Sequence, residues 1–223
     1  MKYRHFIILL FVISAVIAAE VCRHGNIEQQ EKVEQLFRAV REHQVLADFQ
    51  DEFGLSLNKV RLIISRYNSS MPADQKEEIV RTVHQMSVKY AHLNIDLICA
   101  TITHESARTW SPFATSRVGA MGLMQIMPAT GAFLAAEEGL EWSSAENILY
   151  NPVHNIRLGC RYLNALVGMY EQEGGLAAYN GGARRVEMWL AANRNNKVLY
   201  AETRKYVPAV LKLYHQFSSE RSL

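Results

Sequence analysis

A single carboxylate, Glu105, follows an apolar helical stripe, and its surroundings favour acid–base chemistry. After Asn94, a good helix N-cap, Ile95, Ile98 and Ile102 recur on one face, and Glu105 continues that face. Burial among apolar side chains and the negative end of the helix dipole would both raise the pKa of Glu105. A carboxyl group that stays protonated near neutral pH can protonate a glycosidic oxygen, which is otherwise a poor leaving group. Many helix-terminal glutamates are solvated surface groups, so position alone does not assign this role.

The chain changes character directly after Glu105. Ser111-Pro112, Gly119 and Gly122 disfavour a helix, and Pro128 suits the first turn of the next one. The sequence therefore predicts a glycine-spaced loop beside Glu105, and it leaves open whether that loop contains a short β-hairpin.

Four motifs in order carry a resemblance to a known family. They are Glu105-Ser106; Ser116-x-x-Gly119-Ala120-x-Gly122-Leu123-Met124-Gln125-x-Met127-Pro128-x-Thr130; Ala178-Tyr179-Asn180-Gly181-Gly182; and Glu202-Thr203-Arg204-x-Tyr206-Val207. Together they closely resemble the motifs of the soluble lytic transglycosylases, peptidoglycan-cleaving enzymes with a lysozyme-like fold. The resemblance covers about residues 77–217 and implies a mainly α, lysozyme-like helical globule.

The resemblance also implies roles for single residues. Glu105 would be the sole catalytic acid and base. Three substrate-binding positions would line the cleft around the sugars, namely Ser116, Gln125 and Met127. Tyr179 and Asn180 would face Glu105 from the opposite wall, and Glu202 would contact glycan or peptide. Glu105 and Ser116 are 11 residues apart, about two more than the family pattern leads us to expect, and Arg108-Thr109-Trp110 is the place where we expect the extra residues.

Each of these residues also has a structural explanation. Ser116 could cap a turn, and Met127 could fill the core. Tyr179 could be a packed aromatic whose hydroxyl found a partner. Glu202 could form a surface ion pair with Arg204.

The implied reaction uses one carboxyl group twice. Glu105 would protonate the β-1,4 oxygen between N-acetylmuramic acid and N-acetylglucosamine. As a carboxylate it would then take the proton of the C6 hydroxyl while that oxygen closes on C1, which leaves a 1,6-anhydromuramic end. No Asp or Glu lies between Glu105 and Glu137 to serve as a nearby nucleophile. A hydrolytic muramidase on the same fold and a non-catalytic glycan-binding or assembly protein are the alternatives.

Composition excludes few partners. The chain has 223 residues, 49% of them hydrophobic, and a net charge of +2, so we expect no nucleic-acid binding, which needs a clustered basic face. The partner implied by the resemblance is the glycan strand of peptidoglycan. No Cys or His spacing suggests a metal, and no cofactor is implied.

The N-terminus predicts export. Lys2 and Arg4 precede an uncharged run from Phe6 to Ala19 that ends in small side chains. That run is too short for a bilayer-spanning helix, so we expect a signal peptide at residues 1–19, cleaved after Ala18 or Ala19, and a periplasmic location. An uncleaved N-terminal membrane anchor is the alternative.

The remaining chain reads as helices. We expect a helical N-terminal appendage at residues 20–70, a catalytic domain at 71–217 and a tail at 218–223, with the turn-rich Asn68-Ser69-Ser70-Met71-Pro72 as the boundary. Gly174-Gly175 is expected to end the helix that Asn151-Pro152 opens, ahead of another short helix from Leu176 to Asn180. The appendage could bind a partner in cell-envelope machinery, and the oligomeric state is open.

The cysteines leave two possibilities. Cys22, Cys99 and Cys160 would remain after signal cleavage, so at least one is unpaired within the chain. Cys99 and Cys160 lie on predicted buried faces and could be bridged or free.

Overall fold

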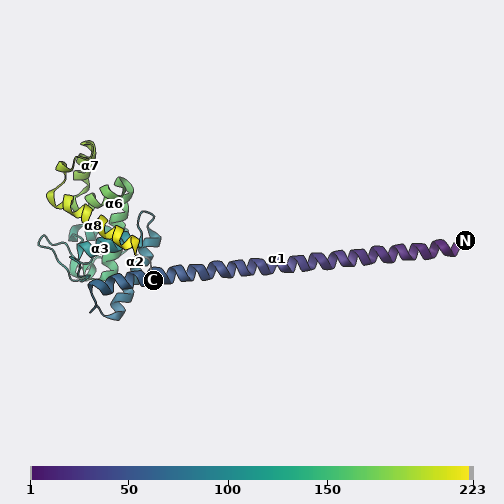
Figure 1. The fold of residues 1–223 in the computed structure, drawn as a ribbon. Helices are drawn as coiled ribbons and strands as arrows, with labels where there is room; N and C mark the ends of the chain where they lie inside the picture. Colours follow the sequence, from purple (N-terminus) through teal and green to yellow (C-terminus); the bar gives the residue numbers. More distant parts are fainter. Residues whose placement is uncertain (1, 221–223) are drawn as a thin grey trace. The chain divides into compact units, whose positions relative to one another are not determined.

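The computed structural model describes the backbone of residues 2–220, and only some side chains among the first 53 residues. The chain divides into two units, Met1–Phe53 (unit 1) and Gly54–Leu223 (unit 2), which are considered separately. Figure 1 labels most of the helices, which are α1 Lys2–Tyr67, α2 Ala73–Lys89, α3 Ile95–Glu105, α4 Pro128–Glu137, α5 Ala145–Leu149, α6 Pro152–Gly181, α7 Ala183–Ala191 and α8 Ala201–Ser219, with a 3-10 turn η1 Asn196–Val198.

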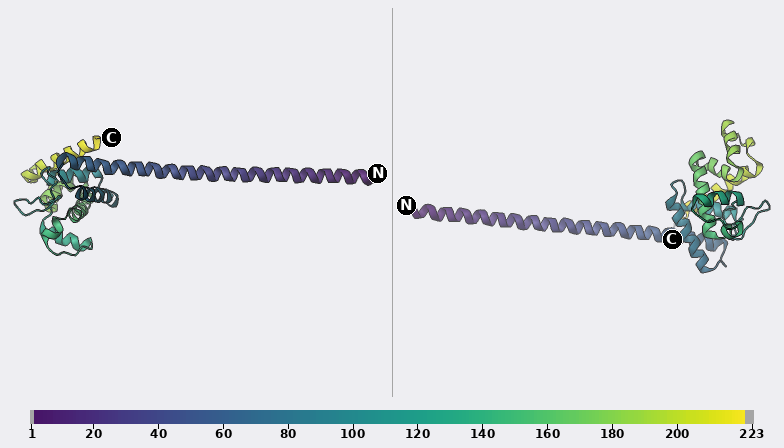
Figure 2. Two further views of the ribbon diagram at one scale, coloured as in Figure 1. Left: turned by 90° about the horizontal axis from the view of Figure 1, so that it is seen from below. Right: turned by 180° about the vertical axis from the view of Figure 1, so that it is seen from behind.

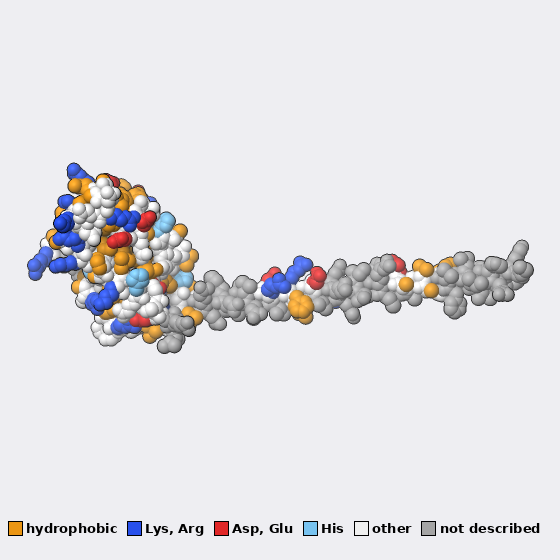
Figure 3. All heavy atoms as spheres, turned by 45° about the horizontal axis from the view of Figure 1, so that its top comes forward, with side chains coloured by type: hydrophobic (Ala, Val, Ile, Leu, Met, Phe, Trp, Pro, Cys, Tyr) orange, Lys and Arg blue, Asp and Glu red, His pale blue; other side chains and the backbone are white. Residues whose placement is uncertain are grey.

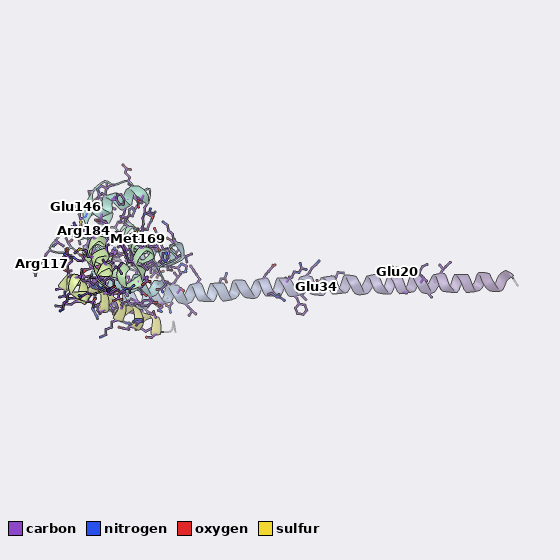
Figure 4. All side chains as sticks on the ribbon, turned by 90° about the horizontal axis from the view of Figure 1, so that it is seen from above. Glu20, Glu34, Arg117, Glu146, Met169 and Arg184 are labelled. Carbon is purple, nitrogen blue, oxygen red and sulfur yellow. The ribbon has the colours of Figure 1, made fainter. Side chains whose placement is uncertain are left out.

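Unit 1 consists of the N-terminal part of α1. Its described side chains are exposed, among them Glu34, which Figure 4 labels. Glu34 and Arg38 form an ion pair of 3.8 Å one helical turn apart. Within the described residues, no helix combines the length and apolar character needed to cross a membrane. Most side chains of the predicted signal peptide lie outside the described residues, and the signal peptide stays a prediction.

The last turns of α1 belong to the core of unit 2. Val60, Ile63 and Ile64 are buried because their helical spacing places them on one face. Arg66 forms a bidentate pair with Glu220 at 2.9 Å, so the end of α1 lies beside the end of α8 in both views of Figure 2. The turn at residues 68–72, where the sequence predicts a domain boundary, joins α1 to α2 within unit 2.

Helix α3 lies at the centre of unit 2 and packs against α8 and α2. All residues from Leu97 to Thr103 are buried, including the polar Thr101 and Thr103, so this part of the helix is enclosed on every side. The predicted N-cap is confirmed, since the side chain of Asn94 accepts a hydrogen bond of 2.8 Å from the Leu97 amide. The mainly α, lysozyme-like globule is also confirmed, and it places Glu105 at the end of its most buried helix.

In the described part of the chain, the loop between α3 and α4 contains isolated β-bridges but no β-strand. Thr115 pairs with Met121, and Met121 pairs with Ile126, both antiparallel. The hairpin left open by the sequence is therefore a compact loop of three bridged segments. Gly122 has φ +80°, and a Cβ there would collide with Asn155 and the Leu149 carbonyl.

Helix α6 differs from the prediction. The expected break is present but lies three residues earlier than Gly174: two helical segments meet at Glu171 (φ 61°, ψ 178°), and the second segment runs through both glycines to Gly181. The glycines permit close packing instead: a Cβ on Gly175 would lie 2.6 Å from Cα of Val167. The separate helix expected from Leu176 to Asn180 is accordingly the second half of α6.

Cys99 and Cys160 are free, buried thiols, and burial raises the pKa of both above the ordinary range. Cys160 Sγ lies 3.9 Å from Sδ of Met124, so it packs behind the loop that follows Glu105. The side chain of Cys22 lies outside the described residues.

Candidate active site

Glu105 is the last residue of α3, and its side chain is partly buried. Burial raises its pKa to about 7, the nearby Tyr206 hydroxyl lowers it, and the negative charge of Glu202 raises it. The carboxyl group is therefore partly protonated near neutral pH, which is the state that a general acid requires.

The turn after Glu105 is strained and anchored. Ala107, Arg108 and Trp110 have φ values of 51°, 63° and 49°, in the left-handed region that non-glycine residues rarely adopt. The fully buried Trp110 holds this turn by donating its indole N–H to Thr103 Oγ1 at 2.9 Å. The extra residues expected between Glu105 and Ser116 thus form a turn locked onto α3, which fixes the end of the helix that carries Glu105.

Two of the predicted cleft residues, Ser116 and Gln125, form hydrogen bonds within the loop between α3 and α4. Ser116 Oγ accepts a hydrogen bond of 2.9 Å from the Ala120 amide, which is the turn-capping role. Gln125 donates from Nε2 to the carbonyls of Ala114 at 3.1 Å and Gly122 at 2.9 Å. Met127, the N-cap residue of α4, is 43% exposed and does not serve as core filler.

Tyr179 connects the loop with the surroundings of Glu105. Its hydroxyl donates to the Met124 carbonyl at 2.7 Å. Burial and, second, the charge of Glu105 raise the pKa of Tyr179, so the two side chains are close enough to interact. The structure therefore places Tyr179 within electrostatic reach of Glu105.

Asn180 and Glu202 meet at the first turn of α8. Asn180 Oδ1 accepts a hydrogen bond of 2.7 Å from Thr203 Oγ1, and Asn180 Nδ2 donates to Glu202 Oε1 at 3.5 Å. Arg204 donates to the Leu199 carbonyl at 2.9 Å, and the described structure contains no Glu202–Arg204 ion pair. Glu202 is exposed, and its charge reaches Glu105.

Sequence reasoning missed two residues that shape the site. Tyr206 is 3% exposed, and its hydroxyl lies near Glu105 and lowers the pKa of that carboxyl group. The contact does not meet the geometric criteria for a hydrogen bond. The position of Tyr206 in the fourth motif was the sequence signal that could have identified it as a residue near the site. Asn155 is fully buried, accepts from the Met124 amide at 2.7 Å and donates to the carbonyls of Met121 and Leu149, both at 2.9 Å. Only the folded chain reveals that contact.

The rest of the surface offers little further chemistry. In Figure 3 several Lys and Arg side chains gather on one face of unit 2, and Figure 4 labels the exposed Arg117 and Arg184. Among the described residues, no group of three or more His, Cys, Asp or Glu side chains could hold a metal ion.

Named relatives match about half of the chain. The soluble lytic murein transglycosylase of Escherichia coli K12 is 38% identical over 125 residues, covering 50% of this chain and 19% of the relative. The membrane-bound lytic murein transglycosylase C of Glaesserella parasuis is 33% identical over 130 residues, covering 54% of this chain and 34% of the relative. The chain therefore spans only a minor part of the curated relatives it matches.

Solved structures support the same assignment. An inactive variant of the lytic transglycosylase Slt from Pseudomonas aeruginosa superposes with a TM-score of 0.55 at 28% identity, over 64% of this chain and 25% of that one. The family model described as Transglycosylase SLT domain matches residues 83–200, more than half of the chain. Because this match covers more than half of the chain, the chain belongs to the transglycosylase SLT domain family.

Proposed function

We propose that the protein is a peptidoglycan lytic transglycosylase that cleaves the β-1,4 bond between N-acetylmuramic acid and N-acetylglucosamine. The observation that carries the proposal is Glu105, whose pKa of about 7 results mainly from burial at the end of α3. The names of the relatives, all murein transglycosylases, support peptidoglycan as the substrate.

Glu105 serves first as the acid. Its proton passes to the glycosidic oxygen as the bond to the muramic C1 breaks, and the acetamido oxygen of the same sugar stabilises the positive charge at C1. The partly buried setting supports this step, because a low-dielectric environment disfavours the ionised carboxylate before reaction.

Glu105 serves next as the base. The carboxylate takes the proton of the C6 hydroxyl while that oxygen bonds to C1, and the acid is restored as a 1,6-anhydromuramic end forms. Tyr206 supports this step, since its hydroxyl faces Glu105 and lowers the pKa of that carboxyl, which favours the ionised form. Ser116, Gln125 and Met127 contribute the loop wall, and Tyr179, Asn180 and Glu202 the opposite wall.

The site of action follows from the N-terminus. Because peptidoglycan lies outside the cytoplasmic membrane, the proposal includes export by the predicted signal peptide and a periplasmic location. Mass spectrometry of the mature N-terminus tests it: a chain that starts after Ala18 or Ala19 agrees, and one that retains Met1 indicates the anchor alternative.

Product analysis tests the reaction. We expect purified protein to release muropeptides with anhydro ends from sacculi, and the nearly isosteric Glu105→Gln to release none while keeping its fold, as read by circular dichroism. Reducing muramic ends would instead indicate the hydrolytic muramidase, for which the neighbouring Glu202 is the candidate second carboxylate. Lysis by Glu105→Gln within a few-fold of wild type would remove Glu105 from its role.

A further inference from the structure

Phe113 is a large aromatic side chain that is left in solvent on the loop between α3 and α4. It is 68% exposed, so its ring is open to a ligand that approaches from solvent. Phe113 lies outside the four motifs that define the family resemblance, and none of the roles described above includes it.

The ring is held in a defined position. Its centroid lies 5.8 Å from that of Tyr150 with an interplanar angle of 56°, so the two rings meet at an angle and are not stacked face to face. Tyr150 is itself fixed, because its hydroxyl and Thr115 Oγ1 share a hydrogen bond of 2.8 Å. The backbone beside Phe113 is fixed as well, since the Ala114 carbonyl accepts from the Gly122 amide at 2.8 Å.

The aromatic corner, Phe113 and Tyr150, is joined by hydrogen bonds to the loop that carries Gln125. Ala114, next to Phe113, also accepts from Gln125 Nε2 at 3.1 Å. Met124 precedes Gln125, and its carbonyl accepts a hydrogen bond of 2.7 Å from the Tyr179 hydroxyl. The charge of Glu105 in turn raises the pKa of Tyr179, after the larger effect of burial. Phe113 therefore belongs to the same hydrogen-bonded loop as Gln125, a proposed cleft residue, and a glycan strand bound along that loop is expected to pass the corner.

A pyranose ring is the ligand that suits such a corner. Its faces carry C–H groups with small positive charge, whereas aromatic faces are negative, so the two stack with weak C–H contacts and exclude water. We propose that Phe113 and Tyr150 form a stacking site for a sugar ring of the glycan strand, away from the bond that is cleaved. The inference rests on the proposed function, because it takes a glycan strand as the substrate.

A neighbouring phenylalanine offers a matched control. Phe133 on α4 is 65% exposed, nearly as much as Phe113, but it makes no ring contact within the described part of the chain. If exposure alone promoted glycan binding, both phenylalanines would contribute. If the built corner is required, only Phe113 will.

The test is binding of a β-1,4-linked N-acetylglucosamine hexamer to Glu105→Gln, which holds the ligand without turnover, measured by isothermal titration calorimetry. Adding Phe113→Ala should weaken the affinity about three- to tenfold, the loss of one ring stacking contact. Phe113→Trp should keep it within about twofold, and Phe133→Ala should leave it unchanged. Because both phenylalanines are exposed, neither substitution is expected to disturb the fold, which circular dichroism checks.

Two results would overturn the stacking site: unchanged affinity in Phe113→Ala, or an equal loss in Phe133→Ala. The outcome is distinguishable from failure of the proposed function. Anhydro products from wild type together with an unaffected Phe113→Ala would reject the stacking site alone. Weakened hexamer binding by Phe113→Ala together with no anhydro products from wild type would reject the reaction alone.

Discussion

At the scale of single residues, the pKa of Glu105 is set by neighbours that act in opposite directions. Burial is the largest influence and raises it, Tyr206 lowers it, and Glu202 raises it. The side chains of Tyr206 and Glu202 both come from the start of α8, one buried and one exposed. The two neighbours therefore offer independent ways to shift the acidity of the same carboxyl group.

The pH dependence of activity should reveal these influences. The rate should fall as pH rises through about 7, because the acid form of Glu105 is then lost. Glu202→Gln removes a negative charge, so the falling limb should move to lower pH. Tyr206→Phe removes a lowering influence, so the limb should move to higher pH. The measurement is the pH profile of anhydromuropeptide release, and shifts of the same sign in both variants would contradict this account.

The raised pKa of Glu105 also predicts that its ionised form lowers the free energy of unfolding. A carboxyl group whose pKa is raised in the folded state contributes stability below its ordinary value of 4.5, and this contribution is lost as pH rises through about 7. Glu105→Gln should therefore become more stable than wild type by about 1–3 kcal/mol at pH 8, allowing for partial exposure, and lose that advantage at pH 4. Urea unfolding at the two pH values measures it, and a pH-independent difference would argue against a raised pKa.

At the scale of elements, the kinked helix α6 connects the two walls of the site. Its first half carries Asn155, which holds Met124 and Met121 of the loop, and its last turns carry Tyr179 and Asn180. The kink at Glu171 and the close approach of Gly175 to Val167 set the direction of the second half. Tyr179 therefore reaches Met124 because the helix bends before the glycines.

Two glycine substitutions should have opposite effects on stability. Gly175→Ala places a Cβ 2.6 Å from Cα of Val167, which cannot move as a side chain could, so we expect a loss of about 1–3 kcal/mol. Gly54→Ala in α1 meets nothing within 4 Å, so better helix propensity should add about 0.5–1 kcal/mol. Chemical denaturation compares them, and a neutral Gly175→Ala would show that α6 can shift.

The helices that sequence predicted well are those with local signals. Asn94, Pro128 and Asn151-Pro152 mark helix starts by capping and proline chemistry, and α3, α4 and α6 begin there. The kink at Glu171 was missed because packing against Val167 makes Gly174 and Gly175 helical. Glu105 was predicted from its helix face together with the motif resemblance. Asn155 acts on a loop 31 residues away from it in sequence, which no local pattern reveals.

At the scale of the whole molecule, the compact unit begins earlier than the turn at residues 68–72 suggests. Val60, Ile63 and Ile64 are buried in the same core as α3. Lys59 adds an ion pair of 2.6 Å with Asp96, at the start of α3. The last turns of α1 are thus part of the scaffold that supports Glu105.

Truncation tests this division. A chain that begins at residue 54 keeps the three buried side chains and should unfold cooperatively at the same temperature as unit 2 in the full chain. A chain that begins at residue 71 loses these three side chains. Their burial contributes about 5 kcal/mol or more to the free energy of unfolding, which is comparable with the stability of a whole domain. The shorter chain should therefore not fold. Thermal unfolding by circular dichroism compares the two, and equal melting temperatures would place the boundary at residue 70 instead.

The buried thiols of Cys99 and Cys160 have a practical consequence. Neither can react with a thiol reagent while the protein is folded, because each is enclosed and its pKa is raised by burial. Cys99 lies in the central helix, and Cys160 lies directly behind Met124. The labelling rates of the two thiols, separated by peptide mapping, would report on two different openings. The rate at Cys99 measures opening of the core, and the rate at Cys160 measures opening of the loop between α3 and α4, with no engineered probe in the chain.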